Sequence, residues 1–138
     1  MELKKTVALL FGLVTLAQAQ MDFPALGPSV DTAIATAAMP QTPIFIVRTT
    51  GVYRVTVLAR TVTAGTAGQI CWNLSWNDGE TGSPVNDGIC GGTTLVGGGP
   101  GTGYLLYAQA NTPISFNTVL NGVTGPYSYR MHFRLEQL

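Results

Sequence analysis

Hydrophobic and polar residues alternate with a period of two along most of the chain after residue 43, which is the pattern of half-buried β-strands. Residues 52–63 and 127–136 show it most clearly. In the first run Tyr53, Val55, Val57 and Ala59 share the face predicted to enter the core, opposite Arg54, Thr56, Leu58 and Arg60. In the second, Tyr127, Tyr129, Met131, Phe133 and Leu135 are predicted inside, and Ser128, Arg130, His132, Arg134 and Glu136 outside. Both runs predict long strands that give one face to a core.

Four further runs of β-branched and aromatic residues predict strands at 44–47, 70–77, 104–110 and 114–120, with Gly, Pro and Asn turn signals between them. In the run 70–77 the alternation turns Trp72 and Trp76 inward and Cys71 outward. Roughly six to eight short strands without a helical pattern are typical of a sandwich, a jelly roll or a small barrel. We therefore expect an all-β domain over residues 43–138.

The segment 20–42 is rich in Ala, Pro and Thr and is predicted to form an N-terminal arm before the β-domain. Pro24, Pro28 and Pro40 divide it into short pieces. Two interpretations stay open: Ser29 caps a brief helix through Ala38, or the segment is a poorly ordered leader.

Residues 1–19 have the three parts of a secretory signal peptide. Two lysines form a basic start, residues 7–16 form an apolar run, and Ala17-Gln18-Ala19 forms a small-residue cleavage site. The apolar run covers about ten residues, whereas a helix that spans a bilayer needs about 20. The sequence therefore predicts a secreted protein, extracellular or periplasmic, with no membrane span.

Charged residues are sparse and balanced, with seven Lys and Arg against seven Asp and Glu in the whole chain. After removal of the signal peptide, the remaining arginines are scattered along the sequence. Nucleic-acid binding requires a basic patch or stripe that neutralises phosphates. The sequence therefore argues against a nucleic-acid partner.

Cys71 and Cys90 both lie in the exported part, and two cysteines in an oxidising compartment predict one disulfide. The bridge closes a loop of about 20 residues, to which the chain-entropy model assigns about 3 kcal/mol. The alternative of a structural zinc site needs four ligands, which two cysteines do not supply.

Residues 77–103 are rich in turn signals and are predicted to form a long loop that the disulfide ties to the outer side of the strand at 70–77, with a short strand at 93–96. The run Gly97 to Gly101 is predicted to be a flexible tip.

Several stretches resemble those of compact jelly-roll modules of phage tail and baseplate proteins and of bacterial surface proteins, which are more remotely similar to C1q and tumour-necrosis-factor domains. They are 51–55 (GVYRV), 76–79 (WNDG), 108–114 and 129–136 (YRMHFRLE). The resemblance implies an antiparallel two-sheet jelly roll, often trimeric, that serves in attachment or as a spacer. A virion protein needs neither an export signal nor a disulfide, so the signal peptide favours a secreted cellular protein.

A group of oxygen-bearing side chains in the segment 77–87 is a candidate ligand or calcium loop, because Ca²⁺ prefers such ligands. Its members are Asn77, Asp78, Glu80, Asn86 and Asp87. The spacing does not match an EF-hand, and Asn-Asp-Gly is also an ordinary turn sequence. Both interpretations stay open, and no cofactor is otherwise indicated.

The remaining candidates are single residues. His132 could act as a general base, but its alternation predicts a surface histidine without a predictable acidic partner. Tyr107 is the candidate exposed aromatic, whereas Trp72 and Trp76 belong first to the core. Asn73 begins a glycosylation sequon in a strand interior, which is a poor acceptor context.

These observations favour a non-enzymatic structural or attachment module that assembles with itself or binds a surface ligand. The resemblance implies a trimer as one form of this assembly. A carbohydrate-binding module is the main alternative and requires an exposed aromatic platform. A small extracellular hydrolase is the third hypothesis, and it requires Asp78, Glu80 or His132 to converge in a cleft.

Overall fold

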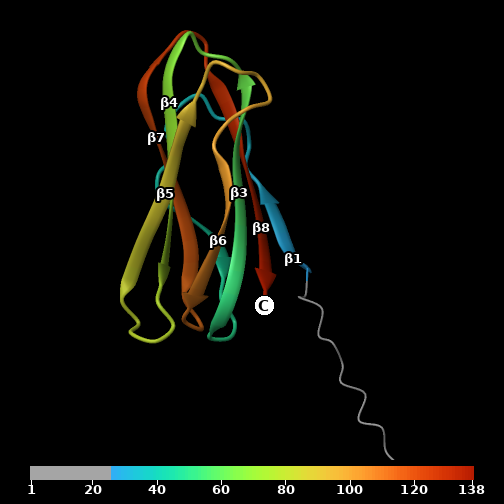
Figure 1. The fold of residues 1–138 in the computed structure, drawn as a ribbon, viewed down its shortest axis with the longest axis vertical. Coiled ribbons are helices and arrows are strands. Elements are labelled where there is room, and N and C mark those ends of the chain that lie inside the picture. Colours follow the sequence, from blue (N-terminus) through green and yellow to red (C-terminus); the bar gives the residue numbers. More distant parts are fainter. Residues whose placement is uncertain (1–25) are drawn as a thin grey trace, which may run out of the picture.

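The computed structural model describes residues 26–138, which form two antiparallel four-stranded sheets packed face to face (Figure 1). The predicted signal peptide lies outside the described residues. The strands are β1 (Leu26–Asp31), β2 (Thr42–Ile46), β3 (Gly51–Thr63), β4 (Ala67–Asn77), β5 (Pro84–Gly92), β6 (Gly101–Ala108), β7 (Pro113–Thr124) and β8 (Ser128–Gln137). Within this part of the chain no helix forms, and so none is long and apolar enough to cross a membrane.

Sheet A has the strand order β1-β8-β3-β6, and sheet B has the order β2-β7-β4-β5. The chain therefore passes between the sheets at every connection except the β4–β5 hairpin, and the last strand lies between the first and the third. This is the connectivity of a two-sheet jelly roll. The fold class predicted from the sequence is confirmed.

The core lies between the sheets and is filled by the inner faces of their strands. The two predicted alternations are confirmed, since Val55, Val57 and Phe133 are buried while their sequence neighbours point outward. Across the sheets, the rings of Phe116 in β7 and Phe133 in β8 lie 4.6 Å apart. Burial of apolar side chains of this size stabilises a fold by about 1.5–3 kcal/mol each.

Two buried polar groups tie the layers together. The Trp72 side chain on β4 donates a hydrogen bond from Nε1 to the carbonyl oxygen of Pro100, at 3.1 Å. The Tyr129 hydroxyl on β8 lies 2.6 Å from the Thr118 hydroxyl on β7 and donates to the Ala37 carbonyl oxygen at 2.9 Å. Burial raises the pKa of Tyr129 above its ordinary value. Each aromatic residue thus fills the core while its polar group has a partner.

The brief helix predicted from Ser29 to Ala38 is wrong. Residues Leu26–Asp31 of the predicted arm form the edge strand β1, in which Ser29 lies opposite Arg134 of β8. A single short helix in water is unstable, whereas the open edge of β8 supplies backbone partners. Pro28 is compatible with this arrangement because it sits on an edge strand.

The predicted long loop at 77–103, with a short strand at 93–96, is also wrong. Its middle is β5, Pro84–Gly92, which pairs in continuous register with β4, and residues 93–96 form no strand. The glycines and asparagines of β5 hide its strand character from the sequence pattern. Pairing with β4 decides the conformation here, because β-propensity depends strongly on context.

The glycine run 97–101 packs against β3 and is not the flexible tip predicted from its composition. The Thr61 N–H donates to the Gly98 carbonyl oxygen at 2.8 Å, and the Gly97 N–H donates to the Thr61 carbonyl oxygen at 2.9 Å. Gly99 has a φ of 150°, and a Cβ atom there would overlap the carbonyl oxygen of Ala59. Glycine is needed at this position because the backbone passes so close to β3.

Candidate functional site

The predicted disulfide between Cys71 and Cys90 is present and lies on the outer face of sheet B. The two residues are directly opposite each other in β4 and β5, so the bridge joins two paired strands instead of pinning a loop. Cys71 faces away from the core, as predicted, yet it is only 8% exposed. Asn121 of β7 lies against it, with Nδ2 3.2 Å from the Cys71 sulfur.

The candidate calcium residues are distributed over the end of β4, where Asn77 lies, the following turn and β5. Asp78 Oδ1 accepts hydrogen bonds from the backbone N–H groups of Glu80 and Thr81, at 3.0 and 2.9 Å. The hydrogen bond from the Thr81 backbone is the main cause that lowers the pKa of Asp78; desolvation opposes it, and the bond from Glu80 adds to the lowering. Asn86 and Asp87 instead lie along β5. Over residues 26–138 no group of three or more His, Cys, Asp or Glu side chains could hold a metal ion, and the turn interpretation accounts for Asp78.

The aromatic candidates are placed as their alternation predicted. Trp72 is fully buried, and Trp76 is partly buried against the core. Tyr107 is 38% exposed on the outer face of sheet A, in the edge strand β6. Its ring lies over Gly79, where a Cβ atom would approach it to 2.6 Å.

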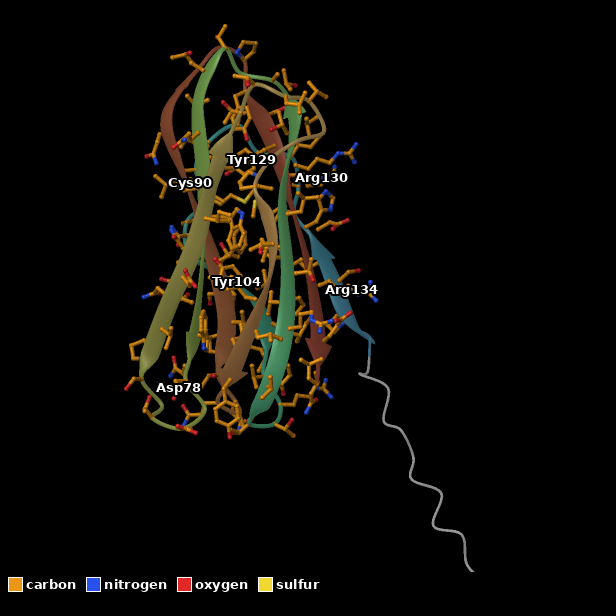
Figure 2. The ribbon with its side chains drawn as sticks, viewed as in Figure 1. Asp78, Cys90, Tyr104, Tyr129, Arg130 and Arg134 are labelled. Atoms are coloured by element: carbon orange, nitrogen blue, oxygen red, sulfur yellow. A yellow bond between two sulfur atoms is a disulfide. The ribbon has the colours of Figure 1, made fainter. Side chains whose placement is uncertain are left out.

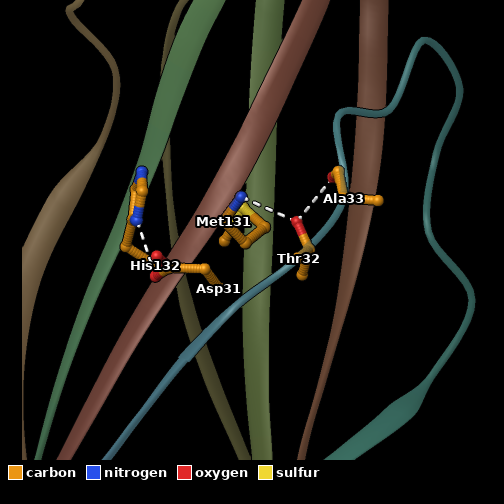
Figure 3. A network of polar contacts seen from close by, with 5 residues as sticks. All are labelled: Asp31, Thr32, Ala33, Met131 and His132. Atoms are coloured by element: carbon orange, nitrogen blue, oxygen red, sulfur yellow. Dashed lines mark hydrogen bonds and ion pairs between the residues drawn. The ribbon is translucent and has the colours of Figure 1, made fainter.

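His132 lies on the outer face of sheet A and has an acidic partner that the sequence did not reveal. Its Nδ1 atom is 2.7 Å from Oδ1 of Asp31, the residue opposite it in β1 (Figure 3). The pair was missed because Asp31 belongs to the segment whose strand was not predicted. Among the described residues the ring has no other hydrogen-bond partner, so the pair is not linked to a nucleophile.

Asn73, the first residue of the sequon, lies in the middle of β4 on the outer face of sheet B. Its neighbours on the two sides are Gly88 of β5 and Asn117 of β7. A Cβ atom at Gly88 would overlap the Asn73 side chain. The asparagine is therefore enclosed by paired strands.

The outer face of sheet A carries most of the charge of the described chain. At one end, Glu136 lies between two arginines, with its Oε2 atom 3.2 Å from Arg54 Nη1 and its Oε1 atom 3.6 Å from Arg134 Nε. At the other end, Arg60 of β3 and Arg130 of β8 are directly opposite each other. Figure 2 shows Arg130 and Arg134 projecting from this side of the sandwich. The alternation in residues 52–63 and 127–136 predicted that these arginines lie on the outer face. It could not predict which arginines lie opposite each other, because that depends on the register between two strands distant in sequence.

The outer face of sheet B is neutral. Its exposed and half-buried positions carry amide and hydroxyl groups, namely Gln69, Asn73, Ser75, Asn86, Asn117 and Asn121. Asp87 is the one charged residue of the sheet B strands, and it lies opposite the core residue Leu74 at the sheet edge. Burial raises the pKa of the nearby Tyr104, and the Asp87 carboxylate adds to this effect.

The four edge strands differ in their protection against pairing with another chain. Proteins guard such edges with proline, charge, bulges or short strands. β1 and β2 each contain a proline and a register shift, and β5 contains Pro84 and Asp87. β6 has the sequence GTGYLLYA, with neither proline nor charge, and pairs with β3 in unbroken register. It is the least protected of the four edges.

Neither a scan against protein-family models nor a search of curated proteins finds a match for this chain. The functional assignment must therefore come from the geometry of its own residues.

Proposed function

We propose that this protein is an exported, non-enzymatic structural or attachment module that assembles into a two-fold dimer through β6. The observation that carries the proposal is the unprotected edge of β6. Export is supported by the sequence of residues 1–19 and by the disulfide, since disulfides persist in oxidising compartments.

On the open side of β6, backbone groups have no hydrogen-bond partner among the described residues. The Tyr107 carbonyl oxygen accepts from the Gly79 N–H, so it points away from β3. Because backbone groups alternate along a strand, those of Leu105 and Gly103 also point toward the open edge. The hairpin at 77–79 covers the end of β6 at Tyr107, which leaves the stretch 101–106 open.

We assign the open stretch of this edge to β6 of a second copy of the protein. Antiparallel pairing centred on Gly103 places Leu105 of one protomer opposite Gly101 of its partner. Leu105 is 65% exposed on the outer face, and Gly101 has no side chain there. Because Gly101 has no side chain, no side chain directly opposite Leu105 hinders this pairing. The contact is self-complementary, as a two-fold axis requires.

The hydrolase hypothesis receives no support from the positions of its candidate residues. Asp78 uses its carboxylate to hold the β4–β5 turn, and His132 is paired with Asp31 on sheet A. Between residues 26 and 138, no hydrogen bond or ion pair joins His132 to Asp78 or Glu80.

Light scattering on the mature protein tests the proposal. Leu105→Lys places a charge on the unprotected edge without disturbing the core, and we expect it to weaken the dimer by about tenfold or more. Leu95→Lys is the matched control, because Leu95 is 70% exposed but lies outside β6. A wild-type monomer at high protein concentration, or equal effects of the two substitutions, would contradict the β6 dimer.

Glycan binding is a second candidate function, favoured by a hollow of about 290 Å³ beside Trp76. Gln41, Ser75 and Asn86, which carry amide and hydroxyl groups, line it together with Trp76, which is partly buried against the core. Neutral hydrogen-bonding groups beside an aromatic ring suit a sugar. A glycan array should show a signal that Asn86→Ala removes and that Asn121→Ala leaves unchanged; no signal with wild type would eliminate this candidate.

A further inference from the structure

We propose that Arg60 and Arg130 together bind the sulfate or phosphate group of an organic ester on the outer face of sheet A. This site is independent of the β6 dimer. The inference starts from the register of β3 and β8, in which the two arginines are directly opposite each other. Directly opposed residues of an antiparallel pair project from the same face with their Cβ atoms about 4.5–5.5 Å apart.

The two guanidinium groups are uncompensated. Like charges directly opposite each other destabilise a sheet, and proteins normally place an acid between them, as Glu136 lies between Arg54 and Arg134 on this same face. In the described part of the chain neither Arg60 nor Arg130 makes an ion pair, and the nearest acid of β1, Asp31, is engaged by His132. The Nε atom of Arg130 is buried without a hydrogen-bond partner. A buried donor without a partner is costly.

A hollow of about 260 Å³ lies at this pair of arginines, and both of them line it. Guanidinium groups present paired donors that match the oxygens of sulfate and phosphate. Two opposed arginines supply such donors from two sides, which a tetrahedral oxyanion can accept simultaneously. The shared ligand chemistry is therefore an oxyanion with several acceptor oxygens.

The rim of the hollow indicates that the oxyanion belongs to a larger molecule. Ile34, Val62 and Val96 also line it and are 51%, 39% and 64% exposed. Aliphatic side chains gain nothing from a free inorganic ion, but they stabilise the organic part of an ester by contact. The geometry thus fits a sulfate or phosphate monoester with an apolar or ring-shaped body.

Isothermal titration calorimetry of the mature protein with four probes tests this assignment. The probes are inorganic sulfate, inorganic phosphate, 4-nitrophenyl sulfate and 4-nitrophenyl phosphate. We expect saturable binding of at least one ester, tighter than that of the corresponding inorganic ion, and the preferred ester separates sulfate from phosphate. Inorganic ions that bind as tightly as the esters would overturn the ester assignment, and no saturable heat with any probe would overturn the site.

Three variants locate the binding. Arg60→Gln and Arg130→Gln should each weaken ester binding by about tenfold or more, since each removes charge-assisted hydrogen bonds. Arg134→Gln is the matched control: it removes the same charge from the same face, but at a residue that Glu136 compensates, so its effect should stay within about twofold. An equal loss in Arg134→Gln would show general charge attraction and overturn the site. Thermal unfolding checks the fold, and Arg60→Gln without anion should unfold at the same or a higher temperature than wild type.

Discussion

The outer face of sheet A carries arginines and acids, whereas that of sheet B carries amides, hydroxyls and the disulfide. Exposed aliphatic side chains occur in both sheets. The inner faces of the two sheets are alike, since both fill one apolar core. What differs is how each sheet is held on its solvent side. Sheet B is crosslinked covalently between β4 and β5, whereas sheet A has ion pairs around Glu136 and a hydrogen bond between His132 and Asp31.

This contrast separates residues that stabilise the sandwich from residues available for binding. A covalent crosslink on a neutral face contributes to stability and attracts no charged ligand. On sheet A, in contrast, Arg60 and Arg130 make no ion pair with any residue of 26–138, and the edge strand β6 has neither proline nor charge. Both of these features lie on sheet A, which is where we propose that the β6 dimer and the oxyanion site form.

Removing the disulfide should have the largest effect on stability. Cys71→Ala combined with Cys90→Ala opens a loop with a sequence separation of 19, and the free energy of unfolding should fall by about 3 kcal/mol. Urea denaturation at low and high salt measures it, and the loss should not depend on salt. A loss under about 1 kcal/mol would contradict the proposed difference between the sheets, because the disulfide would then contribute little to the stability of sheet B.

Tyr129→Phe should have an intermediate effect, because it acts on the core that both sheets share. It removes a buried hydroxyl that contacts Thr118 and Ala37, and we expect a loss of about 1–2 kcal/mol at neutral pH. Burial raises the pKa of Tyr129, so the folded state favours the neutral phenol. Its contribution is complete below the unfolded pKa of about 10 and is lost as the pH rises through the folded pKa.

The pH dependence of unfolding provides the check on this prediction. Wild type should lose stability more steeply than Tyr129→Phe above about pH 10, although Tyr127, whose pKa burial also raises, remains in both. Identical slopes for the two proteins would show that Tyr129 does not titrate differently in the folded state.

Glu136→Gln should have the smallest effect on stability, about 0.5 kcal/mol, because Arg54 and Arg134 are about half exposed and surface ion pairs contribute little. The difference from wild type should disappear at high salt. A loss as large as that of the disulfide variant would erase the distinction between a covalently and an electrostatically held sheet. Thermal unfolding at two ionic strengths measures it.

Much of the sandwich could be predicted from local sequence patterns. The alternation in 52–63 and 127–136 identifies the two central strands of sheet A, because a long period-two run reports a face buried against a core. The disulfide was predicted from the presence of two cysteines in the exported part, and the outward direction of Cys71 from the alternation in residues 70–77. These inferences succeed because the physical cause lies within one strand.

The edge strands and the paired charges could not be predicted in this way. β1 contains proline and glycine, and β5 contains proline, glycine and asparagine. Both become strands because β8 and β4 offer them backbone partners. The contacts between Asp31 and His132, and between Arg60 and Arg130, depend on the register of strands that are distant in sequence. These residue pairs can therefore be identified only from the assembled sheet, in which the register is known.

Hydrogen exchange of the Gly103 and Leu105 backbone amides, measured by NMR over a range of protein concentrations, tests the β6 dimer most directly. Both amides point to the open edge in the single protomer and have no partner there among the described residues. We predict that their protection rises with protein concentration, in parallel with the dimer fraction from light scattering, and that Leu105→Lys abolishes the rise. Exchange of both amides at the rate of free amides at every concentration would contradict assembly through β6.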